Sequence, residues 1–201
     1  MNDKIRDLLD QIGTLEEELR NAVQEHEGKL RYTISGRRIA FERSVREAHA
    51  KVMMNAFRWL MTVRPQNYLT APIIYGMIVP LLFADLCVSL YQAVCFPVYR
   101  IAQVRRGDYI VYDYRHLDYL NFFEKFHCQF CAYANGLLAY AVEIVARTEQ
   151  YFCPIKHARK ILHPTARYRR FLEYGAAEDY HAKLEEFRAA LAREQAGKQS
   201  K

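Results

Sequence analysis

Apolar residues recur at heptad spacing through the first 26 residues of the chain. The two apolar heptad positions are filled by Ile5, Leu8, Ile12, Leu15, Leu19 and Ala22, and charged side chains fill most of the others. This pattern predicts one amphipathic helix over residues 1–27. Its apolar stripe either packs on its own domain or forms a short coiled coil, so we expect residues 3–26 to contribute to a core, to a homo-oligomer or to binding of a partner helix.

Residues 28–67 combine a turn region with a second amphipathic pattern. The stretch TISGRRIAF, which contains Gly36, is compatible with a small β-hairpin. From about Phe41 to Val63, apolar residues recur every three or four positions, which predicts one further helix that ends at Arg64-Pro65.

The run from Tyr68 to Tyr99 has 32 residues and contains no Lys, Arg, Glu or His. A membrane-spanning helix needs about 20 apolar residues, so we expect residues 68–99 to be embedded in a membrane. Pro80 lies inside the run and predicts a kink or a break. Basic residues flank both ends, which favours a hairpin bent near Pro80 with both ends in the cytoplasm; a single tilted span and a buried helix of a soluble protein are the alternatives.

Asp85 is the single formal charge inside this run. An acidic side chain in a membrane is unfavourable unless it faces protein or water, so Asp85 is a candidate functional group. One acid alone does not indicate transport.

Residues 100–176 form a helical region rich in cysteine and histidine, and residues 177–201 a polar helix followed by a tail. Asn135-Gly136, Cys153-Pro154 and His163-Pro164 are the expected breaks, and Pro154 can begin a new helix. The predicted fold is therefore mainly α: an N-terminal helix, a Pro-interrupted apolar segment and a C-terminal helical Cys/His region.

Four residues in this region have the spacing of metal ligands. They are Cys128, Cys131, Cys153 and His157, in a C-x2-C pair and a C-x3-H pair. A Cys3His set suits structural zinc, and thiolates also suit an iron-sulfur cluster. A helix between the two pairs keeps them apart, so a shared site requires that helix to bend or requires two antiparallel chains that each donate half. Separate buried cysteines and a redox dithiol at Cys128 and Cys131 are the alternatives.

A second constellation consists of carboxylates and histidines. Its members are Glu124, His127, Glu143, Arg147, Glu178 and His181, with Glu42 or Glu47 as a further ligand. If the chain folds back at Asn135-Gly136, the E-x-x-H pairs resemble in spacing those that hold two iron or manganese ions. Ordinary ion pairs, with Arg147 bound to Glu124 or Glu143, are the simpler interpretation.

Charge and composition limit the function. The net charge is +6, but Lys and Arg are scattered and no zinc finger or RNA-binding consensus is present, so nucleic acid is not an expected partner. The first 25 residues lack a secretory signal, and five cysteines is an odd number, which together favour a cytosolic N-terminus and free or metal-bound thiols. No phosphate loop, nucleophile elbow or H-E-x-x-H motif is found.

The sequence thus favours a membrane-attached, cytosol-facing protein with a Cys/His metal site, zinc before iron-sulfur, and a self-associating N-terminal helix. A metal-free membrane scaffold or membrane-shaping protein is one alternative. A membrane redox enzyme that uses the cysteines or the carboxylate/His set is another, and whether the chain is an enzyme is left open.

Overall fold

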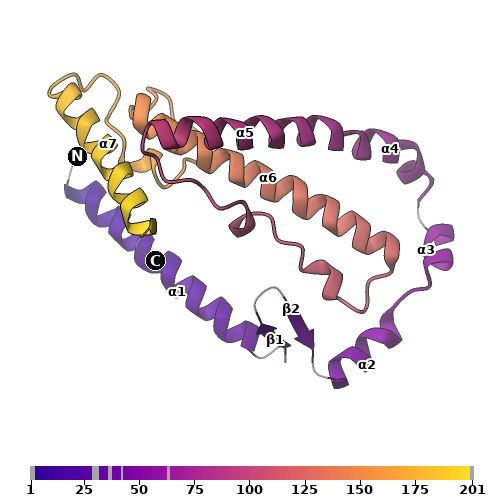
Figure 1. Cartoon of the computed structure of the whole chain (residues 1–201). Helices are drawn as coiled ribbons and strands as arrows, with labels where there is room; N and C mark the ends of the chain where they lie inside the picture. The colour runs from indigo at the N-terminus through magenta and orange to yellow at the C-terminus, as the bar shows by residue number, and fades with distance from the viewer. Residues whose placement is uncertain (1–2, 29–31, 36–37, 42, 63, 200–201) are drawn as a thin grey trace. The chain divides into compact units, whose positions relative to one another are not determined.

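The computed structural model describes residues 3–28, 32–35, 38–41, 43–62 and 64–199. Helices dominate these residues, as the sequence predicts (Figure 1). The chain divides into two units, residues 1–62 with 113–126 and residues 63–112 with 127–201.

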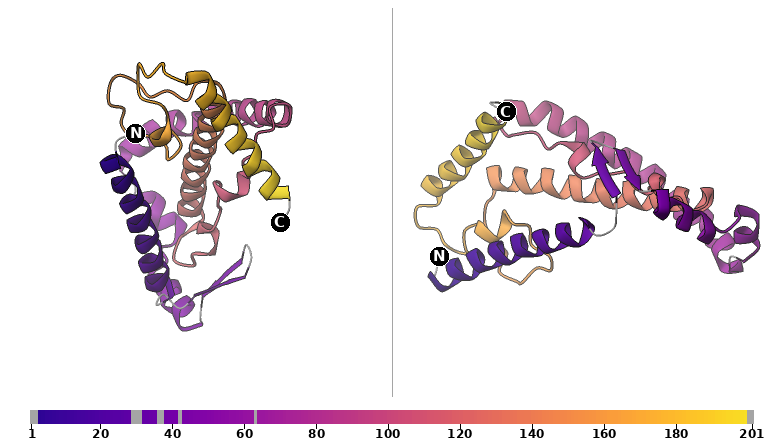
Figure 2. Two further views of the ribbon diagram at one scale, coloured as in Figure 1. Left: turned by 90° about the vertical axis from the view of Figure 1, so that its left-hand side faces the viewer. Right: turned by 90° about the horizontal axis from the view of Figure 1, so that it is seen from below.

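The first unit begins with α1 (Asp3–Gly28) and a two-stranded hairpin. Strands β1 (Tyr32–Ser35) and β2 (Arg38–Phe41) pair antiparallel, with Tyr32 opposite Phe41 and Ser35 opposite Arg38 (Figure 2). The hairpin predicted from TISGRRIAF is therefore confirmed.

The apolar stripe of α1 is exposed wherever the structure describes its side chains. Exposed fractions run from 39% to 65% for Leu8, Ile12, Leu15, Leu19 and Val23. The side chain of Ile5 lies outside the described residues. Packing of this stripe into a core of its own unit is therefore not seen.

The helix predicted from Phe41 to Val63 is two helices, so that prediction was wrong in its extent. These are α2 (Arg43–Val52) and α3 (Ala56–Thr62). Asn55 directly precedes α3, and Asn is a favoured residue at the position before a helix because its side chain can cap the first free N–H groups. The apolar period of three and four does not register such a break.

The second unit begins with α4 (Pro65–Gly76) and α5 (Ile78–Val98), which continue in the same direction (Figure 1). Met77 alone interrupts them. Pro80 has no N–H to donate to the carbonyl of Gly76, which explains why the interruption falls there. The expected interruption is present as this single residue, but the hairpin bent near Pro80 is not, because α5 runs as one helix from Ile78 to Val98.

Helix α6 (Phe122–Phe152) runs for 31 residues through Asn135-Gly136, which were expected to break it. Gly136 has a packing role instead. A Cβ atom at this position would lie 2.5 Å from the carbonyl oxygen of Tyr109 and 2.9 Å from Cα of Ile110. The missing side chain lets another stretch of backbone touch the helix.

Helices α5 and α6 run parallel, as the order of their contacts shows. Along the chain, Asp85 contacts Tyr133, Gln92 contacts Tyr140, Tyr91 contacts Thr148, and Tyr99 stacks on Tyr151 and Phe152. A parallel pair requires the connection to travel back along their length.

Residues 99–112, here called the return segment, make this reverse path. Ala102 lies at Arg147 and Ile110 lies at Gly136, so the segment runs antiparallel to α6. It has no α-helix and no strand, only the 3-10 turn η1 (Arg106–Asp108). Ile101, Val104 and Ile110 are at most 7% exposed, so the segment is part of the core.

The core of the second unit is formed by the return segment, one face of α5 and one face of α6: Phe96, Ile101, Val104, Ile110, Tyr133, Leu137, Tyr140, Ile144 and Leu191. Leu191 belongs to α7 (Tyr180–Gln199), the polar last helix that the sequence predicts. A second 3-10 turn, η2 (Tyr114–His116), precedes α6. Residues 153–179 contain η3 (Tyr168–Arg170) and no α-helix, so Pro154 does not begin one.

Among the described residues, two helical stretches are long and apolar enough to cross a membrane. In Pro65–Val98 the most apolar 18-residue window has a mean hydropathy of 2.1, and none of that window is buried. In Phe122–Phe152 the most apolar 18-residue window has a mean hydropathy of 1.2, and 28% of that window is buried.

Candidate functional site

The four predicted metal ligands lie at the two ends of one unbroken helix. Cys128 and Cys131 are near the start of α6, whereas Cys153 and His157 follow its end. At about 1.5 Å per residue, Cys131 and Cys153 are roughly 33 Å apart along the axis. The structure therefore does not bring the four together within one chain. No group of three or more His, Cys, Asp or Glu in the described part of the chain is placed to hold a metal ion.

The individual members of this set make ordinary contacts. His157 stacks on Tyr168 with a ring distance of 6.0 Å, and its backbone N–H donates to the Tyr168 hydroxyl. Cys131 and Cys153 are exposed thiols, and Cys128 is half-buried. A site shared between two antiparallel chains stays a prediction.

The carboxylate and histidine set is also spread along α6 and beyond. Glu124 accepts the backbone N–H of Asn121, whose own side chain accepts the N–H of Glu124, in a reciprocal cap at the helix start. His127 stacks on Tyr75 at 5.6 Å. Because α6 is continuous, Glu124 and Glu143 are separated by roughly 28 Å of helix and cannot face each other.

The remaining members lie in the C-terminal part and in the first unit. Glu178 and His181 are exposed at the start of α7. Glu42 lies outside the described residues, and Glu47 belongs to α2. Arg147 and Glu143 form an ion pair at 2.8 Å, which is the simpler interpretation that the sequence offered for them.

Asp85 is the centre of the first polar cluster that the structure does bring together. Its carboxylate accepts hydrogen bonds from Tyr133 at 3.0 Å and from Ser89 at 3.2 Å. Arg106 of the return segment contacts both carboxylate oxygens, at 2.5 and 3.4 Å. The side chain of Asp85 is 13% exposed, against 48% for Arg106. The hydrogen bond to Asp85 and its negative charge raise the pKa of Arg106, so this pair stays ionised.

Gln92 lies on the same face of α5 as Asp85, further along the helix, and is buried. Its side chain binds the backbone of the return segment. Its side-chain oxygen accepts the N–H of Val104 at 2.8 Å, and its amide N–H donates to the Val104 carbonyl at 3.2 Å and to the Tyr140 hydroxyl. One amide thus satisfies both backbone groups of a residue that has no strand partner. Unsatisfied backbone groups in a core are strongly unfavourable, so Gln92 is a structural requirement of this segment.

Arg147 completes the support of the return segment from the α6 side. It is 6% exposed, donates to the carbonyl of Ala102 and pairs with Glu143. Arg167 also contacts Glu143, at 3.1 Å, and reaches Gln150 and Glu194 of α7. Burial lowers the pKa of Arg167, but its hydrogen bonds and ion pairs with Glu194 and Glu143 outweigh burial, and the net direction is upward.

These polar groups fix an irregular backbone between two apolar helices, and they do not resemble a reaction centre. Each charge in the two clusters faces an opposite charge, and the carboxylates accept several donors. Asp85, Ser89 and Gln92 are spaced by four and three residues, so they share one face of α5. That spacing within an apolar run was a signal in the sequence for a polar inner face. The sequence interpretation singled out Asp85 alone and missed Gln92, Arg106 and Tyr133.

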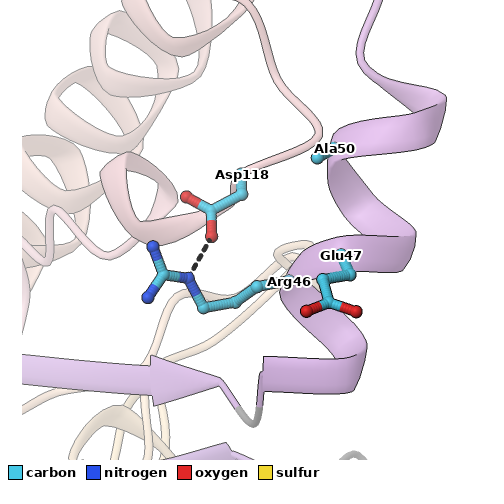
Figure 3. A pocket seen from close by; sticks show the side chains of 4 residues that line it. All are labelled: Arg46, Glu47, Ala50 and Asp118. Carbon is cyan, nitrogen blue, oxygen red and sulfur yellow. Dashed lines mark hydrogen bonds and ion pairs between the residues drawn. The ribbon is translucent and has the colours of Figure 1, made fainter.

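The first unit has an open pocket lined by Arg46, Glu47, Ala50 and Asp118 (Figure 3). Arg46 contacts Asp118 at 3.1 Å, and both side chains are substantially exposed, at 66% and 38%. An exposed ion pair of this kind contributes little binding energy of its own.

No protein-family model, no curated protein and no solved structure matches this chain. Its function has to be inferred from its own residues.

Proposed function

We propose that the chain is a membrane-attached, cytosol-facing scaffold protein, anchored through α4 and α5 and self-associating through α1. The observation that carries the anchor is the surface of α4 and α5. The most apolar 18-residue window within their 34 residues has a mean hydropathy of 2.1, and none of that window is covered by the rest of the chain.

The exposed apolar side chains of these helices form a large patch. Its members are Leu69, Ile73, Ile74, Met77, Val79, Leu82, Phe83, Leu86, Leu90, Val94 and Val98, each at least half exposed. Soluble monomers rarely expose apolar patches of such extent, and a lipid environment removes the penalty. Arg64 before the patch and Arg100 after it are placed for the headgroup region, and anionic lipids favour such basic flanks.

Both polar ends are proposed to lie on the cytosolic side. Basic residues flank the apolar helices at each end, which is the charge distribution that retains both flanks in the cytoplasm. The charged helix α1 and the polar helix α7 then both extend from one membrane face.

Self-association of α1 is supported by its exposed heptad stripe. Leu15 and Leu19 are 62% and 65% exposed, so the face that a coiled coil would bury is uncovered within the chain. A scaffold role follows from the combination of a membrane anchor with an uncovered helix face on one chain.

The zinc or iron-sulfur site of Cys128, Cys131, Cys153 and His157 stays a prediction that requires two chains. Elemental analysis of the detergent-purified protein, beside a Cys128→Ser/Cys153→Ser variant, tests it. Metal present in the native protein and lost in the variant would support the site, and metal retained in the variant would refute these ligands.

Membrane attachment is tested by flotation with vesicles and by alkaline carbonate washing. The native protein is expected to float and to resist carbonate. A Leu86→Lys/Leu90→Lys variant changes two exposed side chains and should be released, because two charges replace lipid-facing apolar groups. Leu162→Lys, at an 83% exposed position outside these helices, is the matched control and should remain attached. Complete release of the native protein would refute the proposal.

A further inference from the structure

The path of the return segment restricts how the second unit can enter a membrane. Because α5 and α6 run parallel, residues 99–112 pass back along both helices, from the end of α5 toward Asp85 and Gly136. If α5 and α6 both crossed the bilayer, this non-helical segment would have to cross as well. Irregular backbone is tolerated at membrane depth only where protein or water surrounds it.

The return segment also exposes charges at the level of α5. Side-chain exposed fractions are 80% for Arg105, 48% for Arg106 and 58% for Asp108. Through its contact with Asp85, Arg106 is placed about 10 Å beyond the start of α5, well inside a spanning helix. Exposed charges at that depth are strongly unfavourable in hydrocarbon, so this side of the unit requires water.

The opposite side of α5 is apolar and exposed. Val79, Phe83, Leu86, Leu90 and Val94 follow one another at three and four residues, and each is at least 59% exposed. Asp85 and Gln92 point away from this stripe, toward the return segment and α6. The second unit thus has an apolar side and a charged side along the same length of helix.

Length supports the same orientation. The 34 residues of α4 and α5 extend about 50 Å, whereas the hydrocarbon core of a bilayer is about 30 Å thick. A helix that crosses would leave apolar side chains in water at one end or the other. A helix that lies in the plane of the membrane has no such limit.

We propose that α4 and α5 lie in the plane of one leaflet, with the apolar stripe toward the acyl chains and the return segment toward water. This inference rests on the proposed membrane attachment and adds the orientation of the anchor. In this orientation the apolar stripe contacts the lipid of a single leaflet.

Tryptophan depth measurements test the orientation. The sole tryptophan, Trp59, is replaced by Phe, and single tryptophans are placed at Val79, Leu86 or Val94. The full-length variants are incorporated into phosphatidylethanolamine/phosphatidylglycerol vesicles that carry bromine at defined acyl positions. An in-plane helix places all three at the same depth. A spanning helix places Leu86 about 10 Å deeper than Val79, which is seven residues closer to the helix start.

Val111→Trp, in the return segment, is the control position. Val111 is 50% exposed on that segment and is expected to be the least quenched of the four positions. Tags at the two termini, probed on membrane vesicles of known sidedness, are expected to be accessible from the same side.

The failures of the two proposals are distinguishable. A depth maximum at Leu86, strong quenching at Val111 or tags on opposite sides would overturn the in-plane orientation while the protein still floats. Absence of quenching at every position together with no flotation would overturn the membrane attachment itself. A doubled mass in that case would assign the apolar stripe to a second copy of the chain.

Discussion

Substitution of Gly136 by Ala tests the close contact between the return segment and α6. The new Cβ atom would lie 2.5 Å from the Tyr109 carbonyl oxygen and 2.9 Å from Ile110 Cα. Both neighbours are backbone atoms of the return segment, so no flexible side chain can move aside. Either α6 or the return segment has to shift.

The magnitude follows from two opposing effects. Overpacking of a well-packed core typically destabilises by about 1–3 kcal/mol. Ala is favoured over Gly inside a helix by about 1 kcal/mol, which offsets part of this. If the return segment lifts off instead, it loses the burial of Ile110, which is 7% exposed, and a buried side chain of this type contributes about 1.5–3 kcal/mol. The helix preference subtracted from either loss leaves about 0–2 kcal/mol, so we expect Gly136→Ala to lower the free energy of unfolding by up to about 2 kcal/mol.

Gly76→Ala is the matched control in the same unit. Gly76 ends α4, and a Cβ atom there would meet nothing within 4 Å. Its helix preference acts unopposed, so stability should rise by up to about 1 kcal/mol. The assay is a denaturant titration of both variants in detergent micelles, followed by circular dichroism. If Gly136→Ala is as stable as Gly76→Ala, the return segment does not pack on α6 at Gly136, and the path assigned to this segment is wrong.

Three further substitutions examine the polar clusters and α1. Asp85→Asn should lower the free energy of unfolding by about 1–2 kcal/mol, because Arg106 loses its counter-charge but stays half exposed to water. The Asp85→Asn/Arg106→Gln double variant should lose less stability than the sum of the two single variants. Strictly additive losses would argue against the ion pair. Gln92→Leu should lower the free energy of unfolding by about 2–4 kcal/mol, since it leaves the N–H and carbonyl of Val104 without hydrogen-bond partners in the core. An unchanged denaturation midpoint would show that these backbone groups find other partners. Leu15→Asp should raise the Kd of oligomer formation at least about 100-fold, because a charge would be buried in place of a leucine. Glu17→Lys, at a position outside the apolar stripe, is the control and should weaken the oligomer far less. If Leu15→Asp leaves the mass measured by light scattering unchanged, self-association through α1 is refuted.

Periodicity was a reliable guide to the existence of helices and an unreliable guide to their ends. The heptads of α1, the hairpin around Gly36 and the polar last helix follow from local patterns, and the structure shows all three. Asn135-Gly136 was interpreted by its local preference as a break. In the structure Gly136 stays helical and packs against Ile110, which is distant in the sequence. A local sequence pattern cannot predict a contact of this kind.

The candidate site was less predictable for the same reason. Asp85 could be identified as a polar group in an apolar run. Its partner Arg106 comes after the chain has reversed its direction, and no sequence pattern predicted that reversal. The spacing of C-x2-C and C-x3-H is a local property, whereas a metal site depends on the distance between the two pairs. Once α6 is continuous, that distance is set by the rise of the helix, and Cys131 and Cys153 are roughly 33 Å apart.

The polar clusters and the apolar outer face of α5 have a common physical explanation. A non-helical segment packed on two apolar helices is stable only if its buried backbone groups find partners inside the protein. Gln92, Arg147 and Asp85 supply those partners from the two helices. The side chains that satisfy the return segment therefore all lie on the inner faces of α5 and α6. This leaves the outer face of α5 free of polar groups over its full length, as contact with acyl chains requires. The same three residues thus explain how a charged segment can lie beside a helix whose outer face is apolar and exposed.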